Sequence, residues 1–190
     1  MTQTSNGIPI GTVRGNVRAW IEQHAGRLGD DVLEIGSRSH RAGTWWIVNR
    51  DLAQGKWTGM DFQPGHGVDV VADLHDLPAE WDGRYTGVLC SEVMEHVKYP
   101  DIALAGIRRV LRPGGVAVFT TLTAFPVHGF PDDYRRWTEN GLRVDLERAG
   151  FVGIETGQAG RVQFTHSDHG GSAVVQHCPV HVFAVCEVAA

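Results

Sequence analysis

The stretch VLEIGSRS, residues 32–39, decides the fold of this chain. Val32, Leu33 and Ile35 make residues 31–35 a predicted short buried strand, and Gly36 ends it where the backbone can approach a ligand closely. Glu34 puts a carboxylate near the strand end, and a negative charge there suits a ligand amino group better than a phosphate. The segment therefore predicts the first strand of a ligand-binding sheet.

Helices and strands alternate on both sides of this strand. Upstream, apolar residues at helical spacing predict a helix within residues 12–28, which Gly29 ends, after a flexible lead over residues 1–12. Downstream, helices are predicted within 40–54, at 100–111 and at 138–149. The remaining strands are predicted at 57–61, 68–72, 84–90, 116–120, 151–155 and 180–188.

Strands that alternate with helices through short loops indicate an α/β fold with a mostly parallel sheet. The chain has no internal repeat, no low-complexity tract and no linker, so residues 1–190 are predicted to form one domain. Two connections, 122–137 and 159–178, are long for such a fold. Long connections in compact domains are often functional, so both are predicted to be loops beside a binding site.

Composition limits the class of protein. A formal net charge of -5 and a pI near 6.0 argue against a partner as acidic as long nucleic acid. No apolar run approaches the roughly 20 residues that span a bilayer, and the N-terminus lacks the pattern of a secretory signal. The three cysteines form no CxxC pair, which indicates reduced thiols. The sequence therefore predicts a cytoplasmic protein with no membrane partner.

A second acidic residue, Asp61, ends the next predicted strand. In an open parallel sheet the carboxyl ends of the strands meet at one edge, and ligands bind there where the strand order reverses. An acidic residue at this place can accept hydrogen bonds from both hydroxyls of a ribose. The alternative is that Asp61 only shapes a turn, and Glu34 on the neighbouring strand favours the binding interpretation.

The order of the whole set of motifs carries more information than any one of them. It runs VLEIGSRS (32–39), WTGMDFQPG (57–65), VDVVADLHDLP (68–78), YTGVLCSEVMEHV (85–97) and IRRVLRPGGVAVFT (107–120). This order resembles class I S-adenosylmethionine-dependent methyltransferases, in particular the family with "EHV" after strand four and "RVLxPGG" before strand five. The resemblance extends from about Asp31 to Phe151. It implies a Rossmann-like, doubly wound seven-stranded sheet of order 3-2-1-4-5-7-6, with the last strand antiparallel.

The resemblance also implies which residues hold S-adenosylmethionine. Glu34 and Gly36 would lie beside its methionine end, Asp61 would hold the ribose, and Phe62 would flank the adenine. The full set of implied contacts is Glu34, Gly36, Ser37, Arg38, Asp61, Phe62, Asp73, Leu74 and Ser91.

One feature departs from the family, because Gly-Ser-Arg-Ser at 36–39 replaces its Gly-x-Gly-x-Gly loop. The ligand carries no pyrophosphate, so a phosphate-cradling loop is not required. Arg38 either pairs with the methionine carboxylate or is a solvated surface arginine.

A second motif, FPVHGFPDDYRRWT at 125–138, resembles the "HGxPxDYxRxT" segment of a subset of this family. It follows the fifth strand, so the resemblance places it near the reacting methyl group. His128 is predicted to act as a general base, with Asp133 and Tyr134 as further catalytic candidates. The alternative is that His128 and Asp133 form a hydrogen bond that only shapes the loop. His96, Glu92 and Glu95 are open between catalytic and structural roles.

Histidines and cysteines gather near the C-terminus at irregular spacing: His166, His169, His177, Cys178, His181 and Cys186. None of their spacings matches a familiar zinc motif, and strand alternation puts His181 and Cys186 on opposite faces. No metal is therefore predicted, and the glycines at 160, 170 and 171 favour a mobile lid over the pocket.

Taken together, these features predict transfer of a methyl group from S-adenosylmethionine to an oxygen or nitrogen of a small-molecule acceptor, leaving S-adenosylhomocysteine. The acceptor pocket would lie between the N-terminal helix and the two long connections. Strand four lacks the Asp/Asn-Pro-Pro-Tyr/Phe signature used on flipped bases, which argues against nucleic acid. A monomer or a homodimer is expected. Two alternatives stay open: other chemistry on the same cofactor, and a non-catalytic partner subunit.

Overall fold

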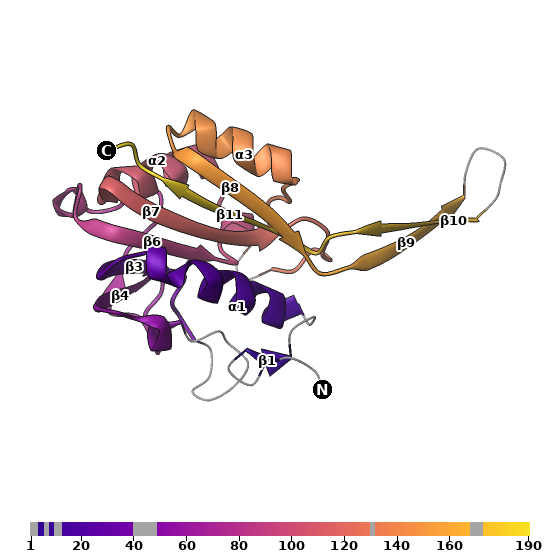
Figure 1. Ribbon diagram of the computed structural model, residues 1–190, viewed down its shortest axis with the longest axis horizontal. Coiled ribbons are helices and arrows are strands. Elements are labelled where there is room, and N and C mark those ends of the chain that lie inside the picture. The colour runs from indigo at the N-terminus through magenta and orange to yellow at the C-terminus, as the bar shows by residue number, and fades with distance from the viewer. Residues whose placement is uncertain (1–3, 6–7, 10–12, 40–48, 130–131, 168–172) are drawn as a thin grey trace.

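Seven strands form one sheet in the part of the chain that the computed structural model describes, residues 4–5, 8–9, 13–39, 49–129, 132–167 and 173–190. Figure 1 shows this sheet as the centre of the molecule. Its strands are β3 (Asp31–Ile35), β4 (Lys56–Asp61), β5 (Val70–Val71), β6 (Tyr85–Ser91), β7 (Leu111–Leu122), β8 (Val152–Ala159) and β11 (His181–Glu187).

The strand order across the sheet is β5-β4-β3-β6-β7-β11-β8. Counted along the chain, this is 3-2-1-4-5-7-6, so the predicted order is confirmed. The pairs from β5 to β7 are parallel, whereas β11 is antiparallel to both of its neighbours. The chain leaves β3 toward β4 on one side and returns to β6 on the other. Ligands bind at such a reversal, beyond the carboxyl ends of the strands.

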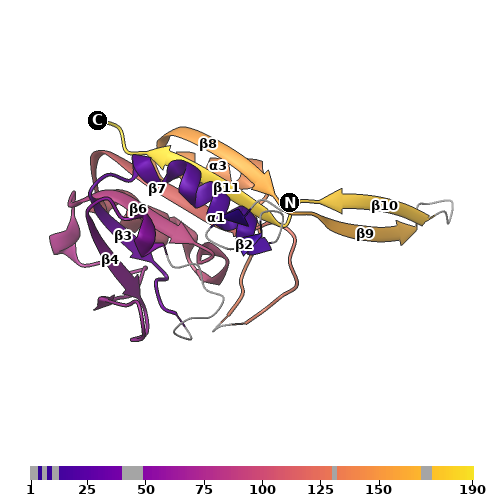
Figure 2. The same cartoon turned by 60° about the horizontal axis from the view of Figure 1, so that its bottom comes forward.

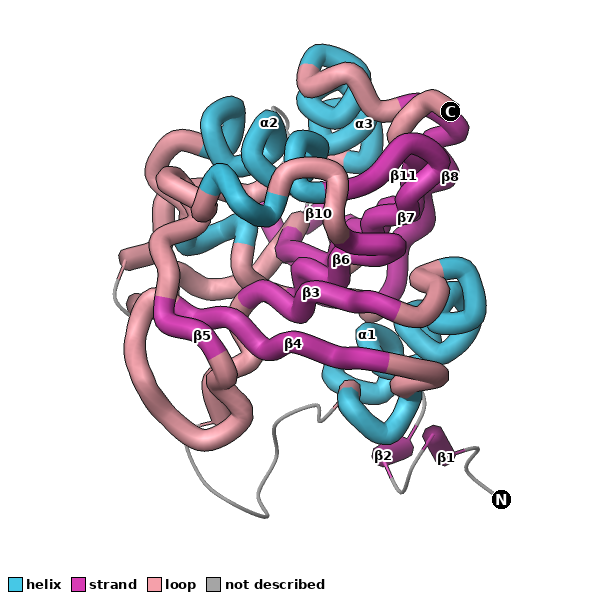
Figure 3. Tube along the Cα trace, turned by 90° about the vertical axis from the view of Figure 1, so that its left-hand side faces the viewer, coloured by secondary structure: helices cyan, strands magenta, loops and turns pink. Residues whose placement is uncertain are grey.

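Helices cover both faces of the sheet, as Figure 3 shows. On one face lies α1 (Val13–His24), whose Val17 and Ile21 pack on Val32 and Leu89. On the other face lie α2 (Pro100–Val110) and α3 (Glu139–Arg148). This is the doubly wound arrangement that alternating strands and helices predict.

The sequence explains where the covering helices begin. Pro100 stands at the first position of α2, where a residue without an N–H group loses no helical hydrogen bond. Thr138 caps α3, since its hydroxyl accepts a hydrogen bond from the Gly141 N–H at 3.1 Å. Short 3-10 helices complete the helical content: η1 (Ala25–Arg27), η2 (Arg50–Leu52), η3 (Ala79–Trp81) and η4 (Met94–His96).

Alternation along β3 sets which face carries the chemistry. Leu33 and Ile35 belong to the core under α2 and α3, while Val32 belongs to the core under α1. Successive side chains of a strand point to opposite faces, so Glu34 lies on the α1 face. The same rule applies in β11, where Phe183 packs in the α1 core and Cys186 in the other.

Three predictions of secondary structure need correction or stay open. The lead is not wholly irregular, because β1 (Thr4–Ser5) pairs antiparallel with β2 (Ile8–Pro9). β7 starts at Leu111 rather than 116, because the turn through Gly114 interrupts the ladder without ending the strand. The helix predicted within 40–54 falls mostly outside the described residues, of which 50–52 form η2.

Residues 159–178 are not the loop that the sequence predicts, and strands occupy much of this connection. β9 (Val162–Ser167) and β10 (Ala173–Cys178) pair antiparallel as a hairpin. Figures 1 and 2 show that this hairpin projects away from the sheet. Its β-branched and aromatic residues favour strand, and they outweigh the histidines and glycines that suggested a loop. None of its described residues lines the cleft introduced below.

No helix in the described part of the chain combines the length and the apolar character needed to cross a bilayer.

Candidate active site

A cleft of about 990 Å³ opens beyond the carboxyl ends of β3, β4, β6 and β7. Every residue that the family resemblance implies for the cofactor lines it: Glu34, Gly36, Ser37, Arg38, Asp61, Phe62, Asp73, Leu74 and Ser91. We call the part around Glu34, Asp61 and Phe62 the β3–β4 side. The part around Ser91, Glu92, His128 and His181 is the β6–β7 side.

The Glu34 carboxylate is buried and held in place by two side chains. The Asn49 amide donates to Oε1 at 2.8 Å, and the Trp57 indole N–H donates to Oε2 at 2.8 Å. Burial raises the pKa of Glu34, and the two hydrogen bonds oppose that rise. Sequence reasoning missed Asn49 and Trp57. Trp57 lies two positions before Gly59, the residue opposite Glu34 on the neighbouring strand, so its contact with Glu34 can be predicted only when the strand register is known.

The loop after β3 needs glycine at position 36. Gly36 has φ of 76°, and a Cβ atom there would lie 2.3 Å from Cγ2 of Val93. The N–H groups of Gly36 and Ser37 both donate to the Met60 carbonyl, which ties the loop to the end of β4. Beyond them, Ser39 forms an antiparallel bridge with His66. The loop therefore follows a defined path without the family's other glycines.

Asp61 and Phe62 present a carboxylate and an aromatic face to the cleft. Oδ1 of Asp61 accepts a hydrogen bond from the Gln63 N–H at 3.0 Å, and within the described residues this is the only partner of its carboxylate. Phe62 is 49% exposed, and its side chain lines the cleft. A flat apolar group could stack there beside a hydroxyl-rich one.

Asp73 forms the outer wall of the β3–β4 side. Its Oδ1 accepts from the His75 N–H at 2.9 Å and lies 2.8 Å from Nδ1 of the same residue. The backbone N–H lowers the pKa of Asp73, so the carboxylate is charged at neutral pH. Next to it, Leu74 is buried and lines the cleft.

The β6–β7 side begins where β6 ends. The Ser91 and Thr120 hydroxyls are 2.9 Å apart, and the Glu92 N–H donates to the Thr120 carbonyl at 2.8 Å. Glu92 has φ of 53°, and in the described part of the chain it is the only residue other than glycine with a positive φ. Its Oε2 lies 3.3 Å from Nε2 of His181, which is completely buried.

The segment from 122 to 137 crosses this side and is fastened at several points. Backbone hydrogen bonds join Tyr134 N–H to the Glu95 carbonyl at 2.8 Å and Trp137 N–H to the Leu122 carbonyl at 2.9 Å. Phe125, His128 and Tyr134 consequently line the cleft. Its two central residues, 130 and 131, lie outside the described part.

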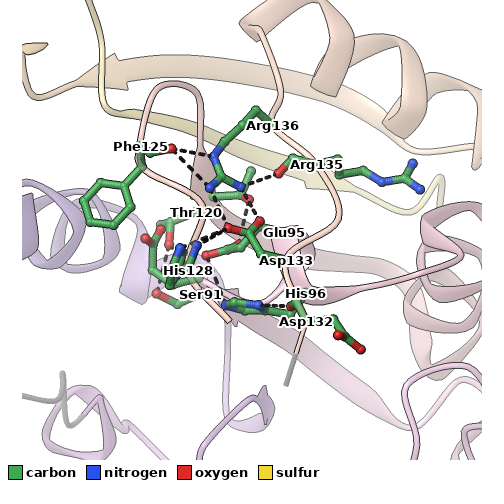
Figure 4. Close-up of polar contacts among 12 residues, drawn as sticks. Ser91, Glu95, His96, Thr120, Phe125, His128, Asp132, Asp133, Arg135 and Arg136 are labelled. Atoms are coloured by element: carbon green, nitrogen blue, oxygen red, sulfur yellow. Dashed lines mark hydrogen bonds and ion pairs between the residues drawn. The ribbon is translucent and has the colours of Figure 1, made fainter. Parts of the chain in front are cut away.

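Asp133 contacts His128, as Figure 4 shows, and it is not among the described residues that line the cleft. Its Oδ2 accepts from the His128 N–H at 2.9 Å and lies 3.1 Å from His128 Nδ1. Arg136 forms an ion pair with the same carboxylate and keeps the pKa of Asp133 well below its usual range. Of the three predicted catalytic side chains, His128 and Tyr134 therefore line the cleft, whereas Asp133 does not.

Three groups of metal-binding type also meet on this side. One ligand atom each from Glu95, His96 and His128 lies within 4.8 Å of the others. The Thr121 hydroxyl donates to Glu95 at 2.8 Å, and burial together with Glu92 raises the pKa of Glu95 to about 8. His96 Nδ1 is 2.6 Å from the Asp132 carbonyl, and its Nε2 lies 3.9 Å from Oε1 of Glu95.

The C-terminal histidines and cysteines do not form a cluster in the described residues. His177 is exposed on the hairpin, while Cys186 is buried on the face of the sheet opposite the α1 core. His169 lies outside the described residues. Among the members of this set whose side chains the structure describes, only His181 reaches the cleft, because β11 runs antiparallel and so starts at the edge where β7 ends.

Comparison with known proteins agrees with this architecture. A family model described as a methyltransferase domain matches residues 12–165. The ubiquinone biosynthesis O-methyltransferase of Aromatoleum aromaticum is 32% identical over an alignment 114 positions long, which covers 54% of this chain and 48% of that protein. The chain thus spans about half the length of the curated relatives it matches.

Solved structures share the fold at low sequence identity. A SAM-dependent methyltransferase from Archaeoglobus fulgidus aligns with a TM-score of 0.62 and 14% identity, over 92% of this chain and 94% of that one. A Burkholderia thailandensis 1,6-didemethyltoxoflavin-N1-methyltransferase, with S-adenosylhomocysteine bound, aligns with a TM-score of 0.59 and 17% identity, over 92% and 77%. The family match covers most of the chain, and the sheet order agrees with it. The chain therefore belongs to the methyltransferase domain family.

Proposed function

We propose that this chain is an S-adenosylmethionine-dependent methyltransferase that methylates an oxygen or nitrogen of a small-molecule acceptor. The observation that carries the proposal is the pair of acidic side chains, Glu34 and Asp61, on neighbouring strand ends that line one cleft. A ligand with an amino-acid half and a nucleoside half would use both.

The described residues fit this cofactor. Asp61 has a carboxylate oxygen without a partner in the described chain, which suits ribose hydroxyls, and exposed Phe62 suits the adenine ring. Gly36 leaves room where a side chain would clash with Val93. The buried Ser37 hydroxyl has no hydrogen-bond partner in the described residues, so it offers a polar contact. Bound in this cleft, the cofactor would supply an electrophilic methyl group on a sulfonium.

The protein's own contribution is alignment and the exclusion of water. Ser91 and the segment through His128 bring the acceptor to the β6–β7 side, next to the end of the cofactor that reacts. Attack on a sulfonium disperses charge, so apolar walls such as Leu122 and Phe125 favour it. His128, fixed by Asp133, lines the same side and is placed to form a hydrogen bond with the acceptor.

The name of the Aromatoleum aromaticum relative, an O-methyltransferase, favours oxygen over nitrogen as the atom methylated. The shared region covers only about half of that protein, so the resemblance supports the reaction more than the acceptor. Sedimentation velocity tests the expected monomer or homodimer.

Mass spectrometry with methyl-deuterated S-adenosylmethionine tests the function. The protein is incubated with a panel of phenols, alcohols and amines, and the expected products are S-adenosylhomocysteine and one labelled methyl ether or methylamine. Another cofactor-derived product would indicate different chemistry, and absence of cofactor binding would favour a partner subunit. Either result would contradict the proposal.

A further inference from the structure

A completely buried histidine meets a strained glutamate at the β6–β7 side of the cleft. His181 opens β11, and its Nε2 lies 3.3 Å from Oε2 of Glu92. That contact is a short distance between two polar atoms and not a hydrogen bond, and neither ring nitrogen of His181 has a hydrogen-bond partner within the described residues. Buried polar atoms are nearly always satisfied, so an unsatisfied imidazole that lines a cleft indicates a role with a ligand.

Glu92 also has a buried polar atom without a hydrogen-bond partner. Its Oε1 is buried without a partner in the described part of the chain, and its side chain lines the cleft. A φ of 53° is unfavourable for a residue with a side chain, and it persists because Thr120 holds the Glu92 N–H. Strained residues of this kind are concentrated at functional sites.

We propose that Glu92 is the catalytic base for a hydroxyl acceptor and that His181 is its positioning residue. This inference rests on the proposed function and narrows its acceptor to a hydroxyl that is protonated at neutral pH. The acceptor oxygen forms a bond to the methyl carbon while the carbon–sulfur bond breaks, and that electron pair stays on sulfur. The hydroxyl proton passes to the Glu92 carboxylate, and His181, whose Nε2 lies 3.3 Å from Oε2, limits where that carboxylate can turn.

Geometry favours Glu92 over the other carboxylate on this side. Glu95 already accepts a hydrogen bond from Thr121, and its side chain is 1% exposed. Burial raises the pKa of Glu95 to about 8, which leaves it largely protonated at neutral pH and so unsuited to accept a proton. The Glu92 side chain is 30% exposed, so an acceptor can reach it.

Phenols of different acidity test the base directly. Near pH 8, phenol with a pKa of about 10 keeps its proton, while 4-nitrophenol is largely ionised and needs no base. Glu92→Gln should lower kcat toward phenol about 100-fold or more, but toward 4-nitrophenol only a few-fold. His181→Asn should show the same selective loss, about 10-fold on phenol. His177→Asn, on the exposed hairpin, is the matched control and should change neither rate.

Nitrogen-15 NMR of histidine side chains gives a readout that needs no turnover. In the free wild-type protein, Glu92→Gln should shift the Nε2 resonance of His181, because it neutralises the partner at 3.3 Å. An unmoved His181 resonance would overturn the pairing. This measurement also serves if His181→Asn disturbs folding.

Other outcomes separate this inference from the proposed function. Equal losses on both phenols would make Glu92 structural and overturn the inference. The inference would also be overturned if the wild-type protein bound S-adenosylhomocysteine but methylated neither phenol. A chelator could also abolish the activity and Mg²⁺ restore it. If both effects were equal in wild type and Glu92→Gln, a bound metal and not Glu92 would be responsible for the loss of the proton, and the inference would be overturned. Failure to bind S-adenosylhomocysteine would instead refute the proposed function itself.

Discussion

Replacing Asp61 with alanine should weaken cofactor binding while the fold stays intact. Asp61 is 9% exposed at the end of β4, and its side chain lines the cleft. Within the described residues its carboxylate has one partner, the Gln63 N–H at 3.0 Å. The carboxylate therefore does little for the loop and is free to accept hydrogen bonds from a ligand.

The magnitude follows from the hydrogen bonds that are lost. A hydrogen bond to a charged group contributes about 1.5–3 kcal/mol, and two ribose hydroxyls share one carboxylate. We expect a loss of about 2–3 kcal/mol, which corresponds to a roughly 30- to 150-fold weaker Kd. The cost to folding should be only about 1 kcal/mol, the typical value of the single Gln63 contact.

Isothermal titration calorimetry with S-adenosylhomocysteine measures the affinity, and thermal unfolding of the free protein measures stability. Asp101→Ala, on the exposed first turn of α2, is the matched control and should change neither quantity beyond about 0.5 kcal/mol. An Asp61→Ala affinity equal to that of wild type would refute the placement of Asp61 in the site. A loss of affinity that came with unfolding would refute the claim that its role is in binding.

Three further predictions concern other parts of the cleft. Gly36→Ala should destabilise the fold by about 3 kcal/mol, because it combines a positive φ with a clash on Val93; Gly114→Ala, with positive φ but open space, should cost about 1 kcal/mol in denaturant titrations. His128→Ala should lower kcat about 10- to 100-fold on any hydroxyl compound that the wild type methylates, yet leave S-adenosylhomocysteine affinity within about twofold; normal turnover would make His128 structural. The raised pKa of Glu95, about 8 against 4.5, means that the folded state binds a proton more tightly than the unfolded state. Stability from this group is thus complete below pH 4.5 and falls as pH rises toward 8, so Glu95→Gln should flatten this part of the stability–pH curve, and an unchanged slope would contradict the assignment.

Local patterns along the chain were sufficient to predict most strands and helices, whereas the order of the strands in the sheet came from the family resemblance. Short apolar runs ended by glycine, as at Gly36, and helical spacing within 100–111 belong to single elements, so they require no knowledge of tertiary contacts. The hairpin of β9 and β10 was missed for the opposite reason. The two strands pack on little of the molecule besides each other, so their sequence shows no buried apolar face. Their histidines also gave the segment a composition that is typical of a loop.

The candidate site likewise has residues that could be predicted from the sequence and contacts that could not. Glu34 and Asp61 were predictable, because parallel strands bring their carboxyl ends to one edge whatever the register. The hydrogen bond from Trp57 to Glu34 depends on the register between β3 and β4, which the sequence does not show. The short distance between His181 and Glu92 depends on the direction of β11 in the sheet. Asp133 was expected in the cleft, but pairing with Arg136 turns its carboxylate to the loop. The type of each residue is known from the sequence, whereas the side chain that contacts it is known only from the structure.

A crystal structure with S-adenosylhomocysteine bound tests the central claim most directly. We predict both ribose hydroxyls within about 2.7–3.2 Å of the Asp61 carboxylate, the adenine against Phe62 and the amino group on the Glu34 side. A ligand bound elsewhere, or a cleft that its own side chains fill between Glu34 and Asp61, would contradict the account.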